Sequence, residues 1–126
     1  MQLGYVILYV GDVGQATRFY EQAFGLGVRF THESGMYAEM ETGATVLAFA
    51  HNDMLAMGTG LAAQTGDKNG FEIALTTDDV AQAVASAVQA GATLIAEPTH
   101  KPWGQTVAYV RDPFGALVEI CTPMGS

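Results

Sequence analysis

An internal repeat constrains the fold of this chain more than any other feature of its sequence. Residues 5–13 read YVILYVGDV, and the matching residues 72–80 read EIALTTDDV. The second copy thus follows the first by 67 positions. Each copy ends in Asp-Val, and a glutamine stands three residues after the aspartate, Gln15 after Asp12 and Gln82 after Asp79. This spacing is typical of a helix N-cap, because the side-chain oxygen accepts a free backbone N–H. A duplicated supersecondary unit is therefore predicted.

Each copy continues with the pattern of one helix and three strands. Apolar residues at three- and four-residue steps predict a helix from Val13 that ends at Gly25, and a second helix from Val80 that ends at Gly91. Short strand-like segments follow each helix, separated by turn residues such as Asp112-Pro113-Phe114-Gly115. They are 28–33, 36–41 and 45–50 in the first copy, and 93–97, 105–111 and 117–122 in the second.

The sequence therefore predicts an α+β fold of two tandem βαβββ modules within one domain. Module one spans 1–50, a connection spans 51–69 and module two spans 70–123. We expect a curved mixed sheet with a cleft and with the helices on its outer face. A single open antiparallel sheet with helices on one face would give the same local elements and differ only in how the halves pair. The connection is too apolar to be predicted as a disordered linker, and we expect it to cover the cleft.

Composition excludes several classes of function. The formal net charge is −8, which opposes binding to nucleic acid or to an anionic membrane surface. No apolar run approaches the roughly 18 residues of a membrane span, and residues 1–10 lack the basic start of a signal peptide. Cys121 is the single cysteine, which fits a reducing, cytoplasmic location. With 49% hydrophobic and 14% charged residues, a homodimer or an apolar cleft is expected.

The doubled unit resembles the vicinal oxygen chelate superfamily, which includes glyoxalase I, extradiol dioxygenases, fosfomycin-resistance enzymes and bleomycin-binding proteins. The likeness covers nearly the whole chain. The segments that carry it are 9–12 (YVGD), Phe19-Tyr20, 24–26 (FGL), Gly91-Ala92, Trp103-Gly104 and the DPxGxxxE pattern from Asp112 to Glu119. The resemblance implies two half-barrel modules whose concave faces form a cleft, often in a dimer. It does not imply one reaction, because this superfamily hosts several chemistries.

The resemblance also implies four places for the ligands of a divalent metal ion, two in each module and typically His and Glu. Here they fall on Tyr5, on Leu47 or Ala48, on Glu72 and on Glu119. Two carboxylates and no histidine fall short of the three protein ligands that catalytic metal sites usually have, so no metal cofactor is expected. Weak binding of Mg²⁺ or Mn²⁺ by Glu72 and Glu119 through water is the alternative.

Strand alternation predicts that Glu72 and Glu119 both face the cleft. Burial and the neighbouring like charge favour the protonated form, so at least one of the pair should have a raised pKa unless a cation or a donor compensates. Possible compensations are a metal, a cationic ligand group, or hydrogen bonds from residues such as Tyr5, which matches Glu72 in the repeat. A carboxyl group satisfied by the Tyr5 hydroxyl or by water is an equally good interpretation.

The remaining candidate residues are aromatic or histidine. Leu47, Phe49 and His51 share a strand face that we expect to be the concave one. His51 is then either a metal ligand or a general base near the cleft, or a solvated residue at the end of the strand. The turn formers Asn52 and Asp53 favour the second interpretation for His51. The aromatic candidates for ligand binding are Tyr5, Phe49, Tyr109 and Trp103, with ordinary core packing as the alternative for all but Trp103.

These observations favour a binding protein similar to the bleomycin-resistance branch of the superfamily, as found in antibiotic resistance. It would hold a small hydrophobic or cationic organic molecule in an acidic, aromatic cleft without metal. The predicted ligand-binding residues are Tyr5, Phe49, His51, Glu72, Trp103, Tyr109 and Glu119. The alternative is a metal-dependent lyase, isomerase or dioxygenase that uses Glu72 and Glu119, or a metal-free enzyme in which one of these residues acts as a general base.

Overall fold

The computed structural model describes residues 1–62 and 71–124, and the chain divides into two compact units, residues 1–64 and 65–126. Each unit is described by itself. Positions 63–70 of the predicted connection lie outside the described residues. The expectation of one cleft enclosed by both modules stays a prediction.

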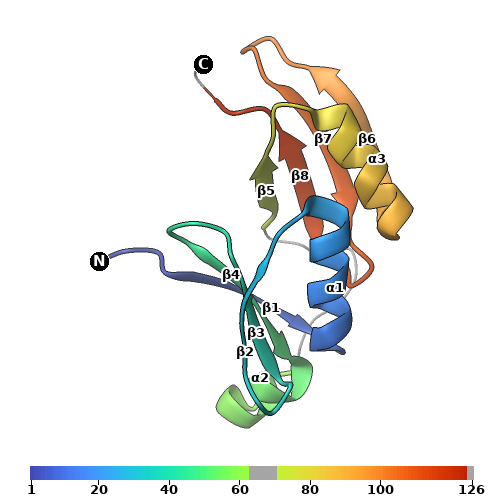
Figure 1. The fold of residues 1–126 in the computed structure, drawn as a ribbon. Coiled ribbons are helices and arrows are strands. Elements are labelled where there is room, and N and C mark those ends of the chain that lie inside the picture. Colours follow the sequence, from blue (N-terminus) through green and yellow to red (C-terminus); the bar gives the residue numbers. More distant parts are fainter. Residues whose placement is uncertain (63–70, 125–126) are drawn as a thin grey trace. The chain divides into compact units, whose positions relative to one another are not determined.

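The first unit contains one four-stranded mixed sheet and two helices (Figure 1). The strand order is β1-β4-β3-β2, with β1 parallel to β4 and the remaining pairs antiparallel. The elements are β1 (Tyr5–Val10), α1 (Val13–Phe24), β2 (Val28–Thr31), β3 (Tyr37–Met40), β4 (Val46–His51) and α2 (Asn52–Thr59).

The second unit repeats this topology in the same order. Its sheet is β5-β8-β7-β6, again with one parallel pair, β5 with β8. The elements are β5 (Ile73–Thr76), α3 (Val80–Ala90), β6 (Thr93–His100), β7 (Thr106–Arg111) and β8 (Leu117–Cys121). The α+β class and the two tandem βαβββ modules predicted from the repeat are therefore confirmed, and each module forms its own sheet.

The predicted helix boundaries are confirmed by their caps. The Asp12 carboxylate accepts a 2.9 Å hydrogen bond from the backbone N–H of Gln15, and Asp79 accepts the corresponding 3.1 Å bond from Gln82. Helix α1 ends at Gly25 with φ of 69°, a left-handed conformation that a side chain would strain. The sequence repeat thus reflects two helix starts built in the same way.

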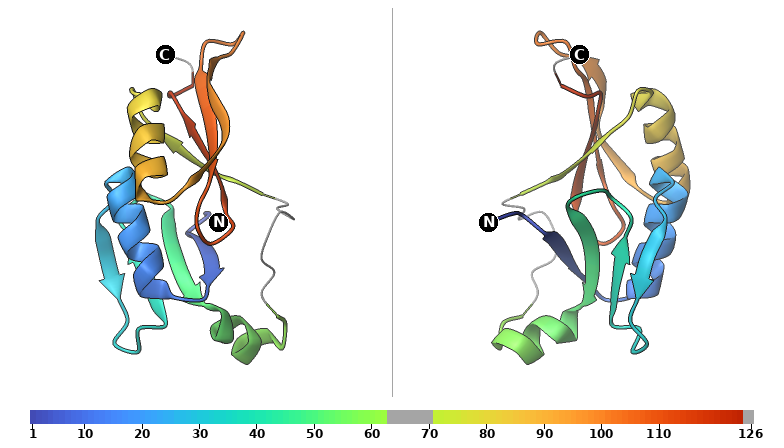
Figure 2. Two further views of the ribbon diagram at one scale, coloured as in Figure 1. Left: turned by 90° about the vertical axis from the view of Figure 1, so that its right-hand side faces the viewer. Right: turned by 60° about the vertical axis from the view of Figure 1, so that its left-hand side comes forward.

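Each sheet packs one face against the long helix of its own unit (Figure 2). In the first unit the packed face contains Leu8, Val10 and Phe49, and the ring of Phe49 lies 4.9 Å from that of Tyr20 on α1. In the second unit Val110, Val118 and Ile120 are buried on the corresponding face. Because strand side chains alternate, the residues between them lie on the opposite face.

We call these opposite surfaces the open faces. The open face of the first unit contains Tyr5, Ile7, Tyr9, Tyr37, Glu39 and Ala48, and that of the second contains Glu72, Ala74, Thr76, Tyr109 and Glu119. Tyr5, Ile7 and Tyr9 are 55%, 41% and 37% exposed, which is unusual for three large side chains along one strand. These exposed side chains make the open faces candidates for ligand binding.

Helix α2 lies where the sequence predicted only a connection. The Nδ1 atom of His51 accepts a hydrogen bond from the backbone N–H of Asp53, and Gly60 ends the helix with φ of 75°. The apolar residues of the helix at positions 54–57 are consecutive, so the sequence shows no helical stripe. None of the residues of α2 is buried. Among the described residues, no helix is long and apolar enough to cross a membrane.

Candidate functional site

Two glutamates meet on the open face of the second unit. Glu119 on β8 lies opposite Tyr109 on β7, and the Tyr109 hydroxyl donates a 2.8 Å hydrogen bond to Glu119 Oε1. Glu72 precedes β5, and its side chain forms a hydrogen bond with that of Glu119. Both predicted carboxylates are thus brought together, with one phenol beside them.

The pKa values of the two carboxyl groups are shifted in opposite directions, and the raised pKa of Glu72 agrees with the expectation that at least one of the pair has a raised pKa. Burial, the hydrogen bond to Glu119 and the charge of Glu119 raise the pKa of Glu72. The pKa of Glu119 is lowered despite its own desolvation, because Cys121, Tyr109 and Glu72 all donate hydrogen bonds to it. The hydrogen bond to Glu119 in turn raises the pKa of Tyr109 to about 12. Within the pair, protonation is therefore easier at Glu72 than at Glu119.

The first unit carries a second phenol–carboxylate pair, which sequence reasoning missed. The Tyr37 hydroxyl donates a 2.7 Å hydrogen bond to Glu39 Oε2, and Arg29 Nε lies 3.7 Å from Glu39 Oε1. Burial and the bond to Glu39 raise the pKa of Tyr37 to about 12. The sequence signal for this pair is the alternation in the segment YAEM, which places Tyr37 and Glu39 on one face of the strand.

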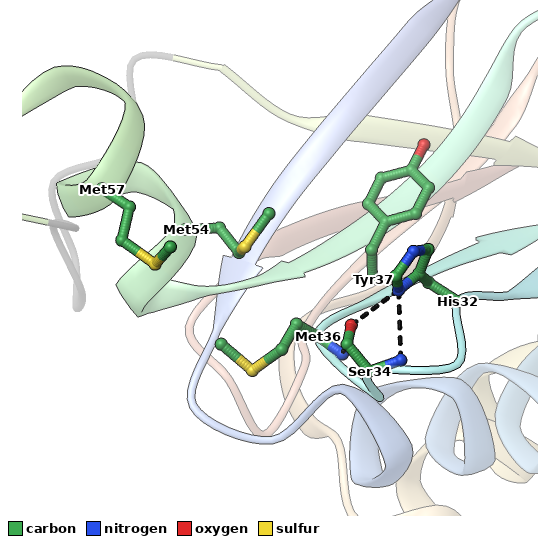
Figure 3. A pocket seen from close by; sticks show the side chains of 6 residues that line it. All are labelled: His32, Ser34, Met36, Tyr37, Met54 and Met57. Carbon is green, nitrogen blue, oxygen red and sulfur yellow. Dashed lines mark hydrogen bonds between the residues drawn. The ribbon is translucent and has the colours of Figure 1, made fainter.

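A pocket of about 560 Å³ adjoins this pair in the first unit (Figure 3). Its walls come from the segment that joins β2 to β3, from β3 itself and from α2. The lining residues are His32, Ser34, Met36, Tyr37, Met54 and Met57. Three thioether side chains and the ring of Tyr37 make the surface mainly apolar. The predicted connection contributes Met54 and Met57 of α2 to this pocket, whereas its covering of a cleft between the modules stays a prediction.

Two predicted ligand-binding residues do not lie on an open face. Phe49 is 0% exposed and packs against Tyr20, so its placement in the cleft was wrong. Leu47, Phe49 and His51 do share a face, but it is the face that packs on α1. The parallel register with β1 places Ala48 beside Ile7 on the open face instead. His51 acts as the N-cap of α2.

Tyr5 and Trp103 are both exposed. Tyr5 lies on the open face of the first unit, near Tyr37. Trp103 lies between β6 and β7, is 61% exposed, and donates a 2.8 Å hydrogen bond through Nε1 to the side chain of Gln105. The indole ring is thus held by its polar edge with its apolar faces accessible.

The side chains at the family's metal positions do not fit a divalent ion. The register selects Ala48 rather than Leu47 as the residue on the open face, so one position offers no donor atom. Tyr5 offers a phenol, so the carboxylates at these positions come from the second unit alone, where Glu72 and Glu119 lie together. Within the described part of the chain, no three His, Cys, Asp or Glu side chains gather in a metal-binding group. Catalytic ions usually need three such ligands.

Comparisons with known proteins agree with the fold. A family model described as Glyoxalase/Bleomycin resistance protein/Dioxygenase superfamily matches residues 2–120. A glyoxalase-related enzyme from Fulvimarina pelagi is 26% identical, with a TM-score of 0.86, over 100% of this chain and 94% of that one.

Two further solved structures show likeness of fold alone. A glyoxalase/bleomycin resistance protein/dioxygenase family enzyme from Burkholderia phytofirmans is 24% identical, with a TM-score of 0.80, over 97% of this chain and 98% of that one. The hypothetical protein SA1046 from S. aureus is 21% identical, with a TM-score of 0.84, over 98% and 95%. Comparison with curated proteins found no match.

Proposed function

Because the chain belongs to the glyoxalase/bleomycin resistance protein/dioxygenase superfamily, we propose that it binds a small hydrophobic or cationic organic molecule and does so without a metal ion. The pocket in the first unit is the observation that carries this proposal. Its volume of about 560 Å³ falls within the roughly 300–1,000 Å³ of small-molecule sites. A single ion would fill only a small part of it.

The chemistry of the walls favours an apolar or aromatic guest. Met36, Met54 and Met57 present polarizable thioethers, which adapt to irregular shapes and make favourable contacts with aromatic rings. Tyr37 adds a ring whose face attracts either another aromatic group or a cation. An anionic guest is disfavoured by the net charge of −8 and by the Glu39 carboxylate bonded to Tyr37.

Independence from metal is supported by the donor set described above. In the first unit the metal positions hold a phenol and a methyl group, and neither matches the His and Glu ligands typical of the family. A metal-dependent lyase, isomerase or dioxygenase is therefore less well supported than metal-free binding. The homodimer and the cytoplasmic location stay predictions.

Thermal unfolding of chelator-treated protein tests the proposal. The probes are quinoline, which is neutral, its cationic analogue N-methylquinolinium, and the ions Mg²⁺, Mn²⁺ and Ni²⁺. At about ten times its dissociation constant, a bound probe should raise the melting temperature by about 3 to 6 °C. We expect at least one organic probe to stabilise the protein and none of the ions to do so.

The variant Met57→Gln should reduce the shift, whereas Ala56→Gln, at an exposed position on the same helix outside the pocket, should not. Neither change touches the core, because α2 has no buried residue. Stabilisation by a metal ion and by neither organic probe would overturn the proposal, and so would the absence of any shift.

One observation favours a second candidate. A glutamate with a raised pKa on an exposed sheet face is suited to proton transfer next to a carbonyl group, and Glu72 meets this description. Exchange of α-protons of small ketones with deuterated solvent, followed by NMR, would show such an activity. It should be lost in Glu72→Gln, and a rate equal to that of buffer would remove this candidate.

A further inference from the structure

The short segment before β3 fixes the hydrogen-bonding state of His32 in the pocket. The backbone N–H of Ser34 donates a 3.1 Å hydrogen bond to His32 Nδ1, and the Ser34 hydroxyl lies 2.8 Å from the same atom. The Ser34 oxygen accepts a 3.1 Å bond from the backbone N–H of Met36, which leaves its hydrogen for His32. Nδ1 is thus an acceptor toward two donors of one residue.

This arrangement determines which nitrogen of the neutral ring carries the proton. When Nδ1 accepts, the hydrogen must be on Nε2. Figure 3 shows Nδ1 bonded to Ser34 and the second ring nitrogen facing away from Ser34. The turn that holds the ring is itself closed by backbone bonds from His32 to Tyr37 and from Gly35 to His32, each 2.9 Å long.

The other polar hydrogens among the pocket side chains are already used. The Tyr37 hydroxyl donates to Glu39, and the Ser34 hydroxyl is directed to His32. The remaining lining side chains are methionines, which have no hydrogen to donate. Among the six residues that line the pocket, His32 Nε2–H is therefore the side-chain donor left for a guest.

We propose that the pocket selects an uncharged, planar aromatic molecule that carries a hydrogen-bond acceptor, and that His32 determines this specificity. The inference rests on the proposed function and narrows its ligand class. The aromatic body would lie against the thioethers, and the acceptor would receive the Nε2–H hydrogen bond. A cation whose only heteroatom carries the positive charge, such as N-methylquinolinium, has no lone pair to offer this donor, and an anionic guest meets the charge of Glu39.

Quinoline and naphthalene form a matched pair for the test, because they differ only by a ring nitrogen in place of a CH group. Their dissociation constants would be measured by ligand-observed NMR with wild-type protein, His32→Phe and His32→Gln. Phenylalanine keeps an aromatic ring without a donor, and the glutamine amide keeps an N–H near the position of Nε2. His32 is exposed, so neither substitution threatens the core.

We expect wild-type protein to bind quinoline about fivefold more tightly than naphthalene, the effect of one hydrogen bond. His32→Phe should abolish this preference, and His32→Gln should restore at least part of it. Equal binding of both probes to wild type would overturn the inference while leaving the proposed binding function intact, and so would a preference that survives in His32→Phe. Failure of both probes to bind would instead count against the proposed function and the inference together.

Discussion

The Tyr109 hydroxyl donates a 2.8 Å hydrogen bond to Oε1 of Glu119, its direct partner across β7 and β8. Deprotonating this phenol would break the bond and place two negative charges side by side, which is why its pKa is raised to about 12. Glu119→Gln should therefore lower the pKa of Tyr109 toward 10.0, the ordinary value. Near-ultraviolet titration of tyrosinate, with Tyr109→Phe to assign the signal, measures this.

The Tyr37 pair provides an internal comparison. Burial is the main cause of its raised pKa, and the bond to Glu39 comes second. Glu39→Gln should consequently lower the pKa of Tyr37 by less than Glu119→Gln lowers that of Tyr109. A larger fall in the pKa of Tyr37 than in that of Tyr109 would contradict this ranking of burial and hydrogen bonding.

Glu72→Gln should stabilise the protein near neutral pH and not in acid. The folded-state pKa of Glu72 lies above 4.5, so its favourable contribution is present below that pH and is lost as the pH rises through the raised value. Glutamine remains neutral and avoids this loss. Melting temperatures of both proteins between about pH 4 and pH 8 would show it, with Glu21→Gln on the exposed side of α1 as the control. A gain in melting temperature that is independent of pH would contradict the raised pKa of Glu72.

Phe49 and Tyr5 should differ sharply in their effect on stability, although both were first assigned to ligand binding. Phe49→Ala removes a fully buried ring from its contact with Tyr20 and should cost about 3 to 5 kcal/mol. Tyr5→Ala changes an exposed side chain and should cost less than about 1 kcal/mol. Urea denaturation measures both. Similar losses would mean that the face assignment of β4 is incorrect.

His51 should act through α2 rather than through a ligand. Its Nδ1 atom caps the helix by accepting the Asp53 N–H, so His51→Ala should destabilise α2 by about 1 kcal/mol. His51→Asn retains a cap and should lose little. Amide hydrogen exchange over residues 52–59 should be accelerated only in the alanine variant. Unchanged amide exchange in His51→Ala would contradict the role of His51 as the N-cap of α2.

The fold could be predicted from the sequence because its signals are local. Asp12 and Asp79 mark two helix starts, and the repeat places the same strands after each, so the topology follows from pattern alone. Glu72 and Glu119 could likewise be paired, because they stand on neighbouring parallel segments of one module.

The candidate site was predicted less completely. Which face of β4 meets α1 depends on whether Phe49 or Ala48 fits against Tyr20, and a segment with apolar residues at 46–50 contains no alternation to decide it. The pocket requires α2, whose apolar residues 54–57 are consecutive in the sequence and so show no helical period. The orientation of His32 depends on a turn in which Ser34 bonds back to it.

NMR of methyl-labelled methionine provides the most direct test of the central claim that a methionine-lined pocket binds an organic molecule without metal. The chain has six methionines, of which Met36, Met54 and Met57 line the pocket, while Met40 is buried against the helix-packed face and Met1 and Met124 are exposed. With chelator present, adding quinoline should shift the methyl signals of Met36, Met54 and Met57 in a saturable way and leave the other three unchanged. Shifts that require a divalent ion, or that spare these three signals, would contradict the account.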